Sequence, residues 1–120
     1  GPDVSYQDPA YVQRVCRDFP TGKFMIAHAA FPHILPSIAA CIAEKNLWLI
    51  PDNYLSITNM PGRNLWVDGI NYTQGRHMVF GTAYPYAGLK QSVDAIKSFG
   101  LRKEYYDKYM YQNALEVLEG

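Results

Sequence analysis

The sequence has little cysteine, no excess of charge of either sign and no long apolar run. Its two cysteines, Cys16 and Cys41, form neither a C-x-x-C pair nor the dense framework of a disulfide-rich secreted domain. Eleven basic and eleven acidic side chains give a formal net charge of zero, so electrostatics favours neither nucleic acid nor an anionic membrane as a partner. No apolar run approaches the roughly 20 residues of a membrane span and no signal peptide is evident, so we expect a cytoplasmic protein.

Short motifs that identify a catalytic site by themselves are also missing. The chain contains no glycine-rich phosphate loop, no H-x-H or H-E-x-x-H pair and no G-x-S-x-G turn. A flavodoxin-like nucleotide binder would fit the alternation of elements described below, but its phosphate loop is not there. Any function therefore has to come from residues that the fold brings together.

What remains is the composition of a folded domain. The residues are 48% hydrophobic and 18% charged, and 120 residues are enough for one core. The opening Gly1-Pro2 resembles the scar of a removed expression tag. We therefore assign residues 1–2 to a tag scar and residues 3–120 to one domain.

Hydrophobic periodicity predicts helices that alternate with three short buried strands. Apolar runs predict strands at 23–28, 47–50 and 77–82, the first of them buried on both faces. Apolar residues at helical spacing predict helices at 9–19, 32–46, 64–73 and 89–99 and a last one from about residue 102, with a loop at 53–63. This order is typical of an α/β fold with a parallel sheet. Three strands leave two open edges, which predicts association with a second copy or another partner.

Three stretches follow the predicted strands at the edge where parallel α/β proteins bind their ligands. By position, His28, Asp52 and Ala83 are expected to face one shared opening. His28 is either an acid/base group or metal ligand, or a histidine that is hydrogen-bonded beneath a loop. Asp52 is either a ligand or base, or part of an ordinary turn. The residues alone leave these alternatives open.

The other polar residues of interest favour structural roles. His33 stands near a helix start and is interpreted as a surface or capping residue. His77 lies at the opposite end of its strand, where a role in stability is expected. Asn113 interrupts the apolar, tyrosine-rich stripe of the last helix, so its amide is expected to hydrogen-bond a nearby group.

Three segments together resemble the C-terminal part of the amidohydrolase superfamily. They read FMIAHAAFP at 24–32, VFGTAYPY at 79–86 and YQNALEVL at 111–118. Their order, and the elements on which they fall, are similar to that family over nearly the whole chain. The resemblance is to the amidohydrolase-related branch, which holds hydrolases and non-oxidative decarboxylases such as aminocarboxymuconate-semialdehyde decarboxylase.

The resemblance implies a partial (β/α)8 TIM barrel, in which the three strands correspond to the sixth, seventh and eighth and are followed by C-terminal helices. His28 matches the family histidine that acts in acid/base catalysis or helps to bind metal, and it is the expected catalytic residue. Asp52 and Tyr84 are possible pocket residues. The family uses a divalent metal such as zinc or manganese.

Three departures from the family pattern limit what the chain is expected to do. Ala29 and Ala30 follow the histidine where the family often has glycines. Ala83 occupies the position of the metal-binding aspartate, and a methyl group can neither bind a metal nor accept a proton. The family's H-x-H on the first strand and its metal histidine on the fifth would precede this segment. We therefore expect no metal or other cofactor in this chain alone.

Two functions from different classes stay open at this point. The first is the C-terminal segment of a metal-dependent hydrolase or decarboxylase, inactive alone and in need of a complementary barrel fragment. The second is a non-catalytic binding or assembly module, formed when partial barrels associate as a homo-oligomer. His28 and Asp52 favour descent from an enzyme, whereas Ala83 favours lost chemistry.

Overall fold

The computed structural model describes residues 3–119, and the proposed tag residues 1–2 lie outside this range. Its sheet consists of two short parallel strands, β1 (Phe24–Ala27) and β2 (Leu47–Ile50), which pair in register along their length. The first two predicted strands are therefore confirmed, with β1 shorter than expected. The parallel pairing is also confirmed, and it places the carboxyl ends of both strands at one edge.

The third predicted strand, at 77–82, is wrong as a regular strand. This segment runs parallel to β2 and meets it at a single bridge, where the Leu49 N–H donates to the carbonyl of His77 and the Val79 N–H donates to the carbonyl of Leu49, both at 2.8 Å. The Phe80 N–H then donates to the carbonyl of Tyr109 at 3.0 Å. Its backbone partner is thus the C-terminal helix, which explains why the strand pairing ends so early.

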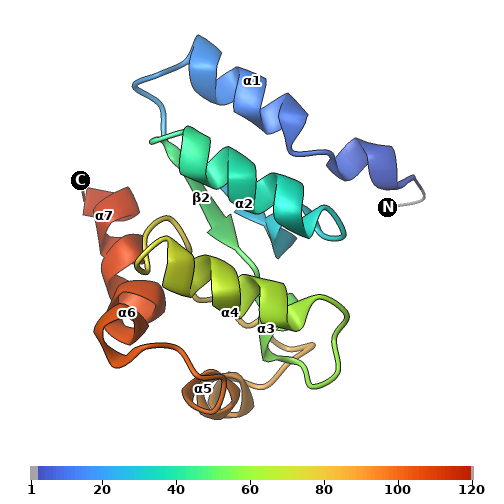
Figure 1. Cartoon of the computed structure of the whole chain (residues 1–120), viewed down its shortest axis with the longest axis vertical. Coiled ribbons are helices and arrows are strands. Elements are labelled where there is room, and N and C mark those ends of the chain that lie inside the picture. The colour runs from blue at the N-terminus through green and yellow to red at the C-terminus, as the bar shows by residue number, and fades with distance from the viewer. Residues whose placement is uncertain (1–2, 120) are drawn as a thin grey trace.

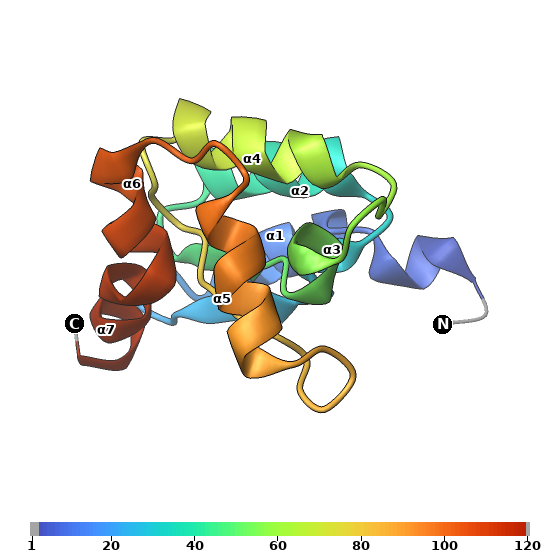
Figure 2. The ribbon, with the colours of Figure 1, turned by 90° about the horizontal axis from the view of Figure 1, so that it is seen from below.

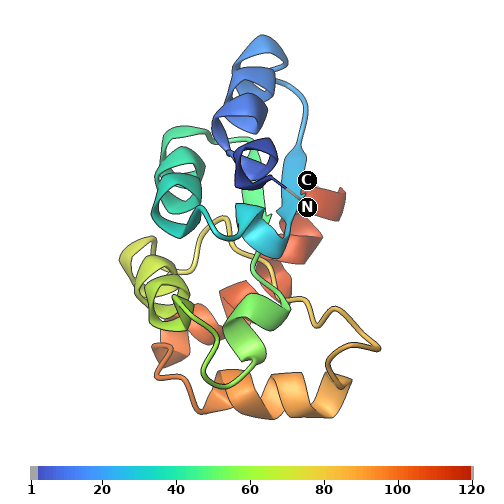
Figure 3. The same ribbon diagram turned by 90° about the vertical axis from the view of Figure 1, so that its right-hand side faces the viewer.

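Helices make up most of the remaining chain. Short 3-10 turns occupy η1 (Val4–Gln7) and η2 (His28–Ala30), and α-helices occupy α1 (Ala10–Asp18), α2 (Ile34–Ala43), α3 (Asn53–Ser56), α4 (Arg63–Tyr72), α5 (Leu89–Lys97), α6 (Lys103–Asp107) and α7 (Asn113–Glu119). The expected helices are confirmed, but α3 falls in the predicted loop. Helices α1, α2 and α4 lie side by side as one layer over the strands (Figures 1 and 3), and Figure 2 shows α2 and α4 on one face of the molecule.

The two strands differ in burial, although both were read from apolar runs. Strand β2 is buried, with Leu47 and Leu49 fully enclosed. Strand β1 alternates, because Phe24 and Ile26 pack on the α1–α2 side while the Met25 side faces outward and is 40% exposed. The expectation that the first strand is buried on both faces is therefore wrong. Helices therefore cover one face of β1, and its other face is open.

The last helix is continuous but changes its winding in the middle. Between α6 and α7, η3 (Lys108–Gln112) is π-helical, and the backbone stays helical through both junctions. Asn113 follows directly and is buried, and its Nδ2 donates to the carbonyls of Gly75 at 2.6 Å and Met78 at 2.7 Å. The predicted hydrogen bonding of this amide is confirmed, and it fastens the helix to the segment beside β2.

Candidate functional site

Two polar side chains that follow different strands meet at the carboxyl edge of the sheet. His28 comes directly after β1, and Asp52 lies two residues beyond the end of β2. The Nδ1 atom of His28 lies 2.8 Å from Oδ2 of Asp52, and the His28 backbone N–H donates to the same oxygen at 3.2 Å. The structure therefore brings together two of the three residues expected at one opening.

An unusual backbone conformation carries His28 to this position. Three successive residues, His28, Ala29 and Ala30, have φ values of 58°, 47° and 61°, and Asp52 has a φ of 47°. Residues with a Cβ avoid this left-handed region because it costs roughly 1–2 kcal/mol each. Backbone strain of this kind concentrates at functional sites, where packing holds it in place. Glycine at positions 29 and 30 would relieve the strain of those two residues.

Burial controls the electrostatics of the pair. The Asp52 side chain is only 7% exposed, whereas that of His28 is 60% exposed. Burial raises the pKa of Asp52 above its ordinary value, and the neighbouring His28 and two backbone N–H groups act in the opposite direction. The Oδ1 atom of Asp52 is buried and has no hydrogen-bond partner among the described residues. One oxygen of the carboxylate is thus used and the other is left unpaired.

Two aromatic rings that the sequence did not single out complete the surroundings of His28. Tyr54 meets the His28 ring edge-on, with centroids 5.7 Å apart, and Phe31 stacks on Tyr54 at 4.1 Å. Each of these rings lies four residues beyond the end of a strand, in the same loop as His28 or Asp52, and this position was the only sign of them in the sequence. Tyr54 thus contacts the imidazole and Phe31 supports Tyr54, while most of the His28 side chain stays exposed to solvent.

The third strand-end stretch comes close to Asp52 through its glycine. A Cβ added to Gly81 would lie 2.7 Å from Cγ2 of Ile50 and 3.4 Å from Cβ of Asp52. Ala83 is partly buried with a φ of 55°, and its carbonyl accepts from the Tyr86 N–H. The Tyr84 side chain is 68% exposed, and its role in a pocket stays a prediction.

The described residues do not by themselves fit a metal ion. Within 3–119 there is no group of three or more His, Cys, Asp or Glu side chains that could hold one. The Nε2 atom of His33 contacts the carbonyl of Val4 at 2.6 Å, and Nδ1 of His77 contacts the carbonyl of Leu47 at 2.9 Å. His28 and Asp52 supply two possible ligands, whereas tetrahedral metal sites use three or four protein ligands.

Comparisons with known proteins agree with this architecture. A family model described as Amidohydrolase matches residues 1–120. A solved structure of an uncharacterized TIM-barrel protein from Bordetella bronchiseptica superposes with a TM-score of 0.89 and 31% identity, over 98% of this chain and 41% of that one. The chain thus spans about two fifths of the length of that protein, and its fold is part of a TIM barrel. No curated protein matches. No helix in residues 3–119 has the length and apolar character to cross a membrane.

Proposed function

Since this chain belongs to the amidohydrolase family, we propose that it supplies the acid/base histidine of a hydrolase or non-oxidative decarboxylase of the aminocarboxymuconate-semialdehyde decarboxylase-like branch. The observation that carries this proposal is the 2.8 Å contact between His28 Nδ1 and Asp52 Oδ2 at the carboxyl edge of the strands. Active sites of TIM barrels lie at this edge.

The geometry of the pair suits proton transfer. When Asp52 accepts a hydrogen bond from Nδ1–H, the neutral imidazole keeps its lone pair on Nε2, where it can take a proton and later return it. The carboxylate also holds the ring in one orientation. Hydrolysis needs a proton for the leaving group and decarboxylation needs one for carbon, so the same histidine serves either reaction.

The divalent metal of the family is not bound by the described residues in this proposal. Amidohydrolases generally use a divalent metal, but the described residues lack a ligand set and Ala83 stands where the resemblance expects an aspartate. The proposed role of His28 therefore rests on His28 and Asp52 alone. We propose that further β/α units, from a complementary barrel fragment or a second copy, supply what these residues lack, and that the 120-residue chain alone shows no turnover in the cytoplasm.

A second candidate function, a non-catalytic assembly module, is favoured by one observation. Strand β1 pairs with β2 on one side only, and Met25 is 40% exposed on its outward face. An open edge with apolar side chains promotes association between chains. In this case His28 and Asp52 would hold the loop together without exchanging protons with a substrate.

The reactivity of His28 distinguishes the two candidates. Diethyl pyrocarbonate acylates a neutral imidazole nitrogen, and mass spectrometry of peptides gives a rate for each histidine. We expect His28 to be acylated faster than His33. We also expect Asp52→Asn to slow the acylation of His28 roughly fivefold, because a hydrogen bond to a charged acceptor is stronger than one to a neutral acceptor by about 1 kcal/mol. Equal His28 rates in the two proteins would overturn the acid/base proposal and support the assembly module.

A turnover assay gives a second test. Cyclic esters, amides and carboxylic acids are offered to the 120-residue chain in the presence of zinc or manganese. The proposal expects no turnover, and any activity found should disappear in His28→Gln and persist in the control His33→Gln. Activity that survives His28→Gln would contradict the assigned role.

A further inference from the structure

Tyr109 is a buried residue whose polar atom has no visible use. Its side chain is fully buried in the main core, and its hydroxyl has no hydrogen-bond partner among the described residues. Phenylalanine would fill the same space without the cost of burying a hydroxyl, which is about 1–3 kcal/mol when the hydroxyl stays unpaired. Oδ1 of Asp52 is the complementary case, a buried acceptor that also lacks a partner.

The C-terminal helix holds Tyr109 in a fixed place beside the third strand-end segment. Tyr109 belongs to the π-helical stretch η3, a winding that is rare and frequent at functional sites. Its carbonyl accepts from the Phe80 N–H at 3.0 Å, and its ring meets that of Phe80 edge-on at 6.1 Å. The two hydrogen bonds from Asn113 to the carbonyls of Gly75 and Met78 anchor the helix one turn later.

The same segment leads directly to Asp52. Gly81 follows Phe80, and it packs so tightly that an added Cβ would lie 3.4 Å from Cβ of Asp52. Burial raises the pKa of Tyr109, and the charge of Asp52 raises it further. The short segment Phe80–Gly81 therefore connects the surroundings of Tyr109 with those of Asp52.

We propose that Tyr109 is a positioning residue of this pair: its buried hydroxyl donates a hydrogen bond to one buried water that in turn donates to Oδ1 of Asp52, and so keeps Oδ2 directed at His28. This inference rests on the proposed function. The carboxylate then has donors on both oxygens, His28 on Oδ2 and the water held by Tyr109 on Oδ1, as a buried anion requires. A buried water is reasonable here because such waters satisfy polar groups that lack a protein partner.

The test compares Tyr109→Phe with Tyr106→Phe. Both variants remove one hydroxyl from the last helix, and Tyr106 also packs against the main core, so it is a matched control. One readout is the 13C shift of the Asp52 side-chain carboxyl at pH 7, and the other is the acylation rate of His28. We expect Tyr109→Phe to move the carboxyl signal and to slow His28 about threefold, because a freed carboxylate turns away from it. Tyr106→Phe should change neither.

Asp52→Asn gives the reciprocal measurement and guards against a folding defect in Tyr109→Phe. The inference expects the ring signals of Tyr109 to shift in Asp52→Asn while those of Tyr106 stay unchanged. Unchanged Tyr109 signals, or wild-type values of both readouts in a folded Tyr109→Phe, would overturn it. If Asp52→Asn still slows His28 in that case, the proposed function stands and only the role of Tyr109 falls.

Discussion

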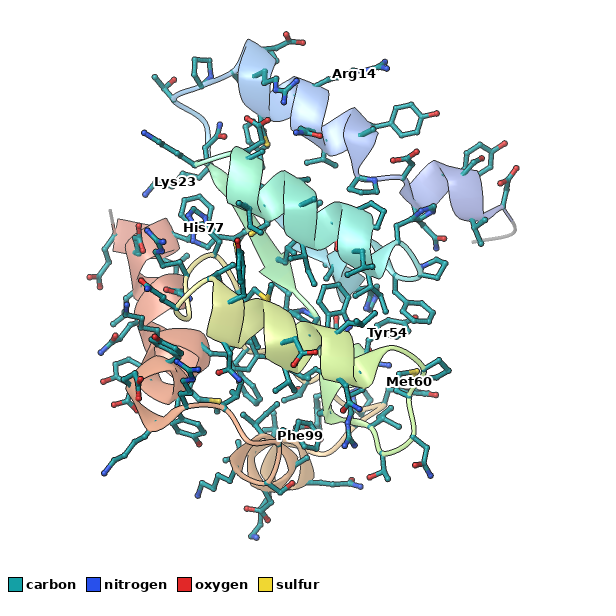
Figure 4. All side chains as sticks on the ribbon, in the orientation of Figure 1. Arg14, Lys23, Tyr54, Met60, His77 and Phe99 are labelled. Atoms are coloured by element: carbon teal, nitrogen blue, oxygen red, sulfur yellow. The ribbon has the colours of Figure 1, made fainter. Side chains whose placement is uncertain are left out.

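The two ends of the strands are built in different ways. At the amino end, polar groups have hydrogen-bond partners. Nδ1 of His77 contacts the carbonyl of Leu47, and the Cys41 thiol lies within hydrogen-bonding distance of the carbonyls of Leu47 and His77. The Asn113 amide donates to the carbonyls of Gly75 and Met78. At the carboxyl end, Oδ1 of Asp52 has no partner among the described residues, and the neighbouring His28 side chain is 60% exposed. Figure 4 shows His77 and Tyr54 at these opposite ends. We therefore expect stability to depend most on the amino end and chemistry on the carboxyl end.

The largest expected effect comes from breaking the satisfied end. Asn113→Ala removes two buried hydrogen bonds and leaves the carbonyls of Gly75 and Met78 unpaired. We expect a loss of about 2–4 kcal/mol in the free energy of unfolding, measured by urea denaturation. Asn64→Ala, at an exposed position of α4, is the control and should stay within about 0.5 kcal/mol of wild type. A small effect of Asn113→Ala would remove the contrast between the two ends.

Crowding the carboxyl end should have the next largest effect. In Gly81→Ala the new methyl group would lie 2.7 Å from Cγ2 of Ile50, so the segment or the strand has to shift. Overpacking of this kind costs about 1–3 kcal/mol. The shift also displaces Asp52, so we expect slower acylation of His28 in the same variant. Gly88→Ala, where the added Cβ has contacts no closer than 3.7 Å, is the control for both measurements.

Replacing Ala83 by aspartate tests whether the carboxyl end can bind a metal. Ala83→Asp adds a hard oxygen ligand at the strand end that follows Gly81, and aspartate tolerates the left-handed backbone there. In a protein that also contains the first five β/α units, we expect zinc or manganese affinity to rise about tenfold, or about 1.4 kcal/mol, by titration calorimetry. The double variant Ala83→Asp, His28→Gln should lose the gain. Unchanged metal uptake would contradict the placement of Ala83 at the family's aspartate position.

Sequence reasoning reached the amino acids at the strand ends but not the contacts behind them. The contact between His28 and Asp52 could be anticipated because parallel strands end at one edge, and Asn113 because an amide on an apolar stripe needs partners. The early end of strand pairing could not be predicted, because it depends on a hydrogen bond from the Phe80 N–H to the carbonyl of Tyr109. Likewise, Tyr109 looked like any other member of a tyrosine-rich stripe. These are tertiary contacts that local periodicity does not encode.

The smallest expected effect separates backbone strain from polar satisfaction. Gln74, at the amino end, has a φ of 59° and an exposed side chain, so Gln74→Gly should stabilise the protein by about 0.5–1 kcal/mol. Ala30, at the carboxyl end, has a φ of 61° but a buried methyl group, whose loss costs about 0.8 kcal/mol. Ala30→Gly should therefore be nearly neutral in thermal denaturation. Because left-handed residues occur at both ends, strain alone does not mark the carboxyl end. If Ala30→Gly stabilised the protein as much as Gln74→Gly, the packing of the Ala30 methyl group would not offset the backbone strain in the turn after β1.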